Sequence, residues 1–180
     1  MNLAEKKLLV VLDACIGCHA CEIACRQENE LTYETGSKWC RVMTLKPRRI
    51  RDELHLDYFP ALCVHCDDPL CVQCCPVEAI VKREDGIVVV DDEKCSGCKL
   101  CVYVCPYGAM SFNEVTNVAG KCNLCLNRLE YGIEPSCVQH CIGGALRYVT
   151  QEDLEKTTKG KHTAFFGKVC YASSKWKLVQ

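Results

Sequence analysis

Cysteine supplies most of the chemistry that this chain can offer. Nineteen of its 180 residues are cysteine, several times the usual content of a globular protein. Cysteine at this level indicates either a disulfide framework or metal binding. Sixteen of the nineteen fall into four groups of four, and Cys40, Cys74 and Cys170 are left over. The first to fourth groups, in chain order, are Cys15, Cys18, Cys21 and Cys25; Cys63, Cys66, Cys71 and Cys75; Cys95, Cys98, Cys101 and Cys105; and Cys122, Cys125, Cys137 and Cys141.

The spacing within the groups favours [4Fe–4S] clusters. The third group reads C-x2-C-x2-C-x3-C and is followed by Pro106, which is the bacterial ferredoxin pattern. In that pattern three closely spaced thiolates surround one cluster, and the fourth cysteine ligates a different one. The first group repeats this spacing, and the second also ends in Cys-Pro. The four groups together predict four [4Fe–4S] clusters.

Zinc is the rival metal, and the pattern fits it poorly. Structural zinc sites take four ligands, usually from two separated Cys-x-x-Cys or Cys/His pairs. Zinc would leave unexplained the three cysteines spaced by two, the fourth three residues later, and the repeated Cys-Pro. A structural or nucleic-acid-binding zinc protein is therefore a distant alternative.

Charge and segment composition exclude several other classes of protein. The formal net charge is −1, so there is no basic surface to follow a phosphate backbone. Cluster ligation would make the net charge more negative, about −9. The start of the chain has no signal-peptide hydrophobic region, and no apolar run reaches the roughly 20 residues that span a bilayer. We therefore expect a cytoplasmic protein with reduced thiols, and co-export with a signal-bearing partner stays open.

Short strands and turns must position the cysteines. The final cysteine of the second, third and fourth groups is followed four residues later by alanine and then an apolar residue, an internal repeat at Ala79, Ala109 and Ala145. After Ala79, apolar stretches on both sides of Glu84-Asp85-Gly86 predict a β-hairpin that leads to Cys95. Further predictions are strands at Leu8 to Leu12 and Trp39 to Leu45 and a short helix beginning at 151. Hydrophobic residues other than cysteine are only roughly 39% of the chain, so clusters are expected to fill much of the interior.

The chain resembles the four-cluster iron–sulfur subunits of molybdenum and tungsten oxidoreductases. The resemblance covers residues 7 to about 149 and is most specific in CVHCDDPLCVQCCP (63–76) and KCNLCLNRLEYGIEPSCVQHC (121–141). Members accompany the dimethyl sulfoxide, polysulfide, thiosulfate and formate enzymes. Relatives serve hydrogenase complexes and tungsten enzymes of the aldehyde-oxidoreductase type, including benzoyl-CoA reductases.

The resemblance implies an α+β fold built from two pseudo-symmetric ferredoxin-like modules of the bacterial 2×[4Fe–4S] type, with short hairpins and cluster loops. Residues 1–150 would form this double domain. Outside the resemblance, the apolar stretch from Phe165 to Tyr171 suggests that residues 151–180 are a C-terminal partner-binding tail. Within the double domain, an outer module would combine 7–25 with 120–150, an inner module would span 60–115, and 26–62 would be an insertion.

The resemblance also implies that each group gives its last cysteine to the cluster of its module partner. The first and fourth groups would exchange ligands, as would the second and third. The implied sets are Cys15, Cys18, Cys21 and Cys141; Cys122, Cys125, Cys137 and Cys25; Cys63, Cys66, Cys71 and Cys105; and Cys95, Cys98, Cys101 and Cys75.

A series of clusters conducts electrons and requires no acid, base or nucleophile, and the sequence suggests no catalytic site. We expect an electron-transfer subunit in an obligate hetero-oligomer, between a tungsto- or molybdopterin catalytic subunit and a further redox protein. A free polyferredoxin and a subunit of a hydrogenase or formate complex are the alternatives. Other residues receive simpler interpretations: His19, His65 and His140 as neighbours of ligands, Cys40 as a buried thiol, and Cys74 and Cys170 as spare.

Overall fold

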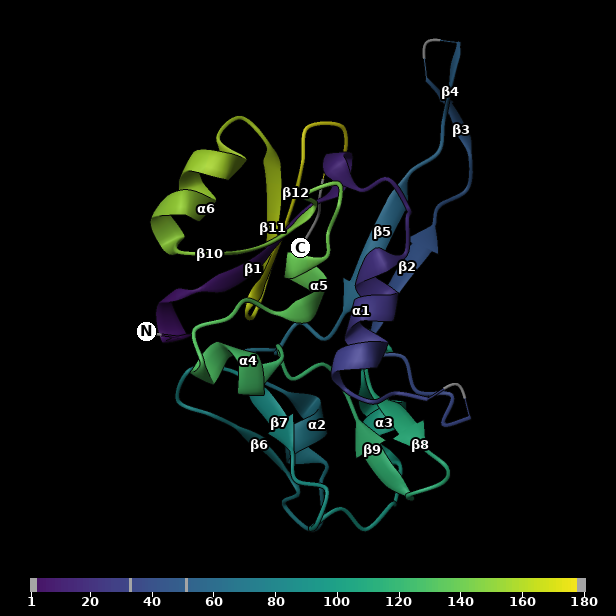
Figure 1. The fold of residues 1–180 in the computed structure, drawn as a ribbon, viewed down its shortest axis with the longest axis vertical. Coiled ribbons are helices and arrows are strands. Elements are labelled where there is room, and N and C mark those ends of the chain that lie inside the picture. Colours follow the sequence, from purple (N-terminus) through teal and green to yellow (C-terminus); the bar gives the residue numbers. More distant parts are fainter. Residues whose placement is uncertain (1–2, 33, 51, 178–180) are drawn as a thin grey trace.

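A four-stranded sheet forms one end of the molecule (Figure 1). The structure is a computed structural model that describes residues 3–32, 34–50 and 52–177. The strand order is β10 (Leu146–Val149), β1 (Lys7–Val11), β12 (Val169–Ser173), β11 (His162–Phe166). β1 pairs antiparallel with β10 and parallel with β12. The predicted strand at Leu8 to Leu12 is confirmed as β1. β1 lies between two other strands, and its side chains from Leu8 to Val11 are buried on both faces of the sheet.

Two strands of this sheet, β11 and β12, come from the residues after 150. α6 (Gln151–Thr158) begins where predicted, with the Thr150 hydroxyl accepting a hydrogen bond from the Asp153 N–H. β11 and β12 follow, and every residue of β12 is buried. Of the apolar residues that suggested a partner-binding tail, Val169, Cys170 and Tyr171 are buried inside the fold, and Phe165 stays 40% exposed. Partner binding by this segment stays a prediction, and residues 178–180 lie outside the described part.

The predicted insertion, residues 26–62, forms a ribbon beside the sheet. β2 (Cys40–Thr44) pairs antiparallel with β5 (Tyr58–Leu62), which confirms the strand predicted at Trp39 to Leu45. Beyond the ribbon, β3 (Arg48–Ile50) and β4 (Glu53–His55) form a projecting hairpin. The ribbon contributes Val42 and Pro60 to one of the cavities described below.

Short helices and hairpins carry the cysteine groups. α1 packs against α5, and α2 packs against α3. The predicted hairpin after Ala79 is confirmed, with Ile80 opposite Val90. The elements of this part are α1 (Ala20–Glu28), α2 (Leu70–Gln73), β6 (Ile80–Lys82), β7 (Val88–Val90), α3 (Leu100–Val104), β8 (Ser111–Asn113), β9 (Val118–Gly120), α4 (Leu126–Glu130) and α5 (Ser136–Gln139).

The mixture of short helices and mainly antiparallel strands agrees with the predicted fold class at this coarse level. Single 3₁₀ turns flank β1: η1 (Leu3–Glu5) before it and η2 (Leu12–Ala14) after it. In residues 3–32, 34–50 and 52–177, no helix combines the length and the apolar character needed to cross a bilayer.

Candidate metal centre

The four Cys-x-x-Cys loops share one backbone conformation. The residue before the second cysteine has a positive φ in every loop: 67° at Gly17, 49° at His65, 72° at Gly97 and 56° at Leu124. Glycine adopts this left-handed conformation readily, whereas histidine and leucine do so rarely. His65 and Leu124 are buried, so tertiary packing holds the two unfavourable cases in place. All four loops therefore share this left-handed position, whereas the residue after the second cysteine has a positive φ only at His19 and Lys99.

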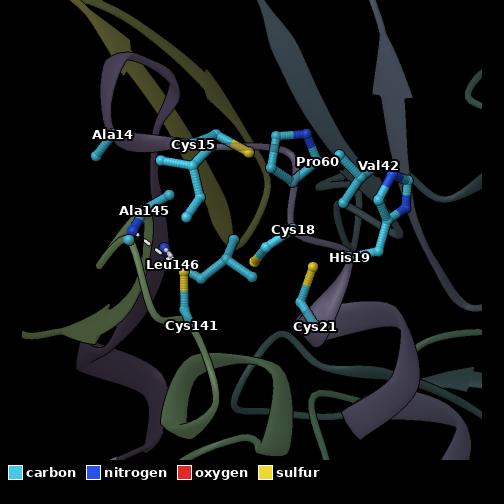
Figure 2. Close-up of a pocket in the computed structure, with 12 residues that line it drawn as sticks. Ala14, Cys15, Cys18, His19, Cys21, Val42, Pro60, Cys141, Ala145 and Leu146 are labelled. Atoms are coloured by element: carbon cyan, nitrogen blue, oxygen red, sulfur yellow. Dashed lines mark hydrogen bonds between the residues drawn. The ribbon is translucent and has the colours of Figure 1, made fainter.

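One cavity is lined by four cysteines from distant parts of the chain. It has a volume of about 310 Å³ and is bordered by Cys15, Cys18, Cys21 and Cys141, which we call site 4. Figure 2 shows these side chains arranged around the cavity, with Leu146, Val42 and Pro60 beside them. The structure thus brings the last cysteine of the fourth group to the first three cysteines of the first group.

A second cavity of about 310 Å³ is lined by Cys75, Cys95, Cys98 and Cys101, which we call site 1. Ile80 and Ala119 contribute to its apolar wall. Here the last cysteine of the second group lies with the first three of the third. Burial raises the pKa of Cys101 to about 12, with further contributions from Cys74, Cys95, Cys71 and Cys98.

A third set of thiols, site 2, consists of Cys63, Cys66, Cys71 and Cys105. Burial raises the pKa of Cys71 to about 11, and repulsion from the Cys63, Cys105 and Cys66 thiolates adds to this effect. The Lys121 ammonium acts in the opposite direction on the same thiol. The four sulfurs are therefore close enough to influence one another's ionisation.

The remaining set, site 3, consists of Cys25, Cys122, Cys125 and Cys137, all buried. Burial raises the pKa of Cys137 well above its usual value, and the other three thiolates of the set add to the shift. Burial likewise raises the pKa of Cys25 to about 12, helped by Cys125. A buried set of thiolates is stable only when a cation compensates its charge.

The four sites form a series. Charge repulsion from Cys71 of site 2 contributes, together with burial, to the raised pKa of Cys101 in site 1. Repulsion from Cys63 of site 2 contributes in the same way to the raised pKa of Cys122 in site 3. Cys21 of site 4 contributes likewise to the raised pKa of Cys25 in site 3. Each site is therefore next to the following one, in the order 1, 2, 3, 4.

The internal repeat reflects hydrogen bonds to sulfur. The alanine four residues after a terminal cysteine donates its backbone N–H to that cysteine's Sγ. The three bonds run from Ala79 to Cys75 at 3.3 Å, from Ala109 to Cys105 at 3.3 Å, and from Ala145 to Cys141 at 3.2 Å. These alanines are buried, which explains why the repeat uses a small apolar residue.

Asn29 replaces this donor in the first group, and the sequence analysis missed it. α1 continues past Cys25, so the backbone N–H of Asn29 donates to the Cys25 carbonyl at 3.1 Å. The Asn29 side-chain amide donates to the same carbonyl at 2.9 Å and to Cys25 Sγ at 3.8 Å. The same side chain hydrogen-bonds Cys125 and opposes the burial that raises the pKa of that thiol. Asn29 could have been found because it occupies the alanine position of the repeat.

Two of the leftover cysteines lie close to the sites. Cys40 is buried, as predicted, and a hydrogen bond from its thiol lowers the pKa of Cys21. Cys74 is partly exposed, and its thiol donates to the Cys71 carbonyl at 3.5 Å. Cys170 is fully buried inside β12, away from the cavities of sites 1 and 4.

The three histidines make protein contacts. His19 lines the cavity of site 4, with Nδ1 3.1 Å from Glu22 Oε1. His140 Nδ1 is 2.9 Å from the Ser136 carbonyl oxygen. His65 is fully buried and accepts a hydrogen bond from the Val88 N–H at 3.0 Å. In the described residues, no three His, Cys, Asp or Glu side chains are arranged to hold a single metal ion.

Sulfur-lined sites carried on Cys-x-x-Cys loops and short hairpins define an iron–sulfur protein of the ferredoxin type. Residues 54–151 match the family described as 4Fe-4S dicluster domain, and residues 12–33 match a 4Fe-4S binding domain. Since the first match covers more than half of the sequence, the protein belongs to the 4Fe-4S dicluster family and its cofactors are [4Fe–4S] clusters. The resemblance found in the sequence is thereby confirmed.

Three relatives illustrate the range of this similarity. A subunit of the tetrathionate reductase of Salmonella typhimurium is 43% identical over 141 residues, covering 77% of this protein and 55% of the relative. A subunit of the anaerobic dimethyl sulfoxide reductase of Escherichia coli is 36% identical over 151 residues, covering 79% and 72%. The iron-sulfur subunit of the nitrate-inducible formate dehydrogenase of Escherichia coli is 33% identical over 165 residues, covering 84% and 56%. The protein thus matches little more than half the length of two of these relatives.

Proposed function

We propose that this protein is the electron-transfer subunit of a molybdenum or tungsten oxidoreductase and carries four [4Fe–4S] clusters in a row. The observation that carries the proposal is the arrangement of sixteen cysteines as four neighbouring sets of four. The names of the relatives, which are subunits of a tetrathionate reductase, a dimethyl sulfoxide reductase and a formate dehydrogenase, support the assignment to such a complex.

We assign the ligands as sites 1 to 4 group them. Site 1 would use Cys75, Cys95, Cys98 and Cys101; site 2, Cys63, Cys66, Cys71 and Cys105; site 3, Cys25, Cys122, Cys125 and Cys137; and site 4, Cys15, Cys18, Cys21 and Cys141. The cavities at sites 1 and 4 support this assignment most directly. The N–H donated to Cys75 by Ala79 favours Cys75 over Cys74 as the ligand, because it matches the other repeats.

The residues present fit a cluster at each site. Cluster ligands must be thiolates, and buried thiolates need the positive charge that iron provides. The buried Nε2 atom of His65, between two ligands of site 2, has no hydrogen-bond partner among the described residues. When bound, each cluster supplies a one-electron redox centre. The protein would hold these centres, exclude water from site 3, and tune the centres with N–H donors.

The proposed domain organisation follows the same pairing. An outer module of 7–25 and 120–150 would hold sites 3 and 4, and an inner module of 60–115 would hold sites 1 and 2. Packing of α1 against α5 and of α2 against α3 supports this two-fold pseudo-symmetry. Residues 26–62 would be the insertion.

The ends of the series are suited to exchange with partners. Among the sixteen assigned ligands, only Cys18 of site 4 and Cys98 of site 1 are exposed. Exposed cluster edges let redox proteins approach, whereas the four cysteines of site 3 are all buried. One end would therefore face the pterin-containing catalytic subunit and the other end a second redox protein. Catalysis would occur in the partner, and this protein would contribute no catalytic residue.

Anaerobic purification from the native cells tests the proposal. Iron, sulfide, molybdenum, tungsten and co-eluting subunits would be measured in the same peak. We expect about sixteen irons per polypeptide, together with molybdenum or tungsten and a large subunit. The same iron content without a companion would indicate a free polyferredoxin. Stoichiometric zinc with little iron would overturn the assignment.

A further inference from the structure

Lys121 is a buried cation without an anionic side chain beside it. It follows β9, directly before Cys122, and is only 3% exposed. Its Nζ donates to the backbone carbonyls of Val88 and, at 3.0 Å, Cys122. In the described part of the sequence, no Asp or Glu pairs with Lys121 within 4.0 Å.

Such a charge is costly unless something negative compensates it. Carbonyl dipoles satisfy the N–H groups of a lysine but carry no net charge, and burial of an uncompensated ammonium is strongly unfavourable. The nearby His65 offers no negative charge, because an imidazole ring is neutral or positive. His65 Nδ1 also accepts the Val88 N–H, which fixes a neutral ring nitrogen there.

The anions near Lys121 are thiolates of the proposed cluster sites. Val88 joins Lys121 to site 2, because its carbonyl accepts from Lys121 Nζ and its N–H donates to His65 Nδ1, and His65 lies between Cys63 and Cys66 in the sequence. The Lys121 charge also opposes the burial that raises the pKa of Cys71. Cys122, the next residue in the sequence, belongs to site 3, and Cys63 of site 2 is close enough to affect it. Lys121 therefore lies where sites 2 and 3 meet, at the junction of the two proposed modules.

We propose that Lys121 sets the reduction potential of the cluster at site 2, holding it higher than the same ligands would without this charge. The inference rests on the proposed ligand sets. Reduction places one additional electron on the cluster, forms or breaks no bond and takes up no proton. A fixed cation in a medium of low dielectric constant favours the form with more negative charge. The protein would thus use one buried lysine to favour residence of an electron midway along the series.

The test is an EPR-monitored redox titration of the anaerobically purified complex, with dithionite as reductant. In Lys121→Met, one of the four midpoint potentials should fall, which lowers the ratio of reduced to oxidised cluster about tenfold at a fixed solution potential. Lys121→Arg, which keeps the charge, should restore most of the potential. Lys156→Met is the control for loss of a lysine charge elsewhere, because Lys156 is paired with Glu152 at 2.6 Å on α6.

Iron content separates the possible results. Four unchanged potentials in Lys121→Met with full iron would overturn the inference and leave the proposed function intact. If Lys121→Met loses a cluster, Lys121→Gln, which keeps a donor for the carbonyls, is titrated instead. Loss of the cluster in both neutral variants but not in Lys121→Arg supports a role for the charge, and loss in all three variants means a packing role and refutes it. A wild-type protein without clusters would refute the proposed function itself.

Discussion

The residue four places after each terminal cysteine is a hydrogen-bond donor to sulfur. At three sites this donor is the backbone N–H of a buried alanine, and at site 3 it is the side chain of Asn29. Hydrogen bonds to cluster sulfur stabilise the reduced form and raise the potential. A backbone donor cannot be removed by substitution, whereas the Asn29 amide can.

We therefore expect Asn29→Ala to lower the potential of the site 3 cluster. Loss of one such bond corresponds to about 1 kcal/mol, or roughly 40 mV for a one-electron couple. Redox titration followed by EPR measures the shift. Asn113→Ala is the control, because the Asn113 side chain accepts from Val115 and Thr116 in an exposed turn and contacts no sulfur. An equal shift in both variants would contradict this role of Asn29.

The adjacent Cys74 and Cys75 provide a second comparison of single residues. Cys75 lines the cavity of site 1 and accepts the Ala79 N–H, whereas the Cys74 thiol donates to a carbonyl. Cys75→Ser should reduce the iron content from about sixteen to about twelve per polypeptide, and Cys74→Ser should leave it unchanged. Colorimetric iron and sulfide assays decide the matter. Cluster loss in Cys74→Ser alone would reverse the ligand assignment at site 1.

At the scale of elements, the turn between β11 and β12 supports the loop that carries Cys63 and Cys66. Lys168 donates its backbone N–H to the Val64 carbonyl at 2.9 Å. Gly167 has a φ of 51°, and a Cβ there would lie 2.0 Å from the His65 carbonyl oxygen. Only glycine permits this approach, so the residues after 150 are part of the support of site 2.

Gly167→Ala should therefore destabilise the protein by about 3 kcal/mol or more, since it combines positive-φ strain with a backbone clash. Gly160→Ala is a matched control: Gly160 also has a positive φ, 76°, but its Cβ would meet nothing within 4 Å. The control should cost about 1 kcal/mol. Anaerobic chemical unfolding of the cluster-loaded protein measures both. Equal losses would show that the contact with His65 contributes nothing.

The elements differed in how far the sequence could predict them. β1, β2, the β6–β7 hairpin and the start of α6 were predictable, because apolar runs, turn residues and a helix cap are local signals. The membership of β12 in the sheet was not, because it depends on pairing Leu8 with Val169. The cysteine groups were visible from their spacing, but Lys121 and Asn29 were not. Their importance depends on burial and on contacts with sulfur across the fold.

At the scale of the whole molecule, two kinds of interior coexist. Leu9, Val11, Leu154, Cys170 and Ala172 form an apolar cluster between β1, β12 and α6 that contains no assigned ligand. The main core, by contrast, includes ligands from sites 2, 3 and 4 among its buried residues. The cluster between β1, β12 and α6 is stabilised by ordinary apolar burial. The stability of the main core, which contains the ligands, depends on bound metal.

Removal of iron should therefore affect the two interiors differently. After chelation under reducing conditions, we expect amide hydrogen exchange to increase strongly in residues 63–75 and 122–141. The β1–β12 pair should retain more of its protection, because metal binding contributes folding energy mainly where the ligands lie. Mass spectrometry of the exchanged protein distinguishes the regions. Uniform loss of protection would mean that the protein unfolds as one unit without iron.

The parallel pairing of β1 with β12 also has a consequence for biogenesis. Leu8 lies opposite Val169, and all sixteen assigned ligands fall between these two positions in the sequence. During translation, β1 emerges early, but it cannot pair with β12 until every ligand has left the ribosome. The sheet is thus completed last, and the turn that follows β11 then closes over the Cys63–Cys66 loop. All sixteen cysteine ligands are therefore available for cluster assembly before β12 pairs with β1 and completes the sheet.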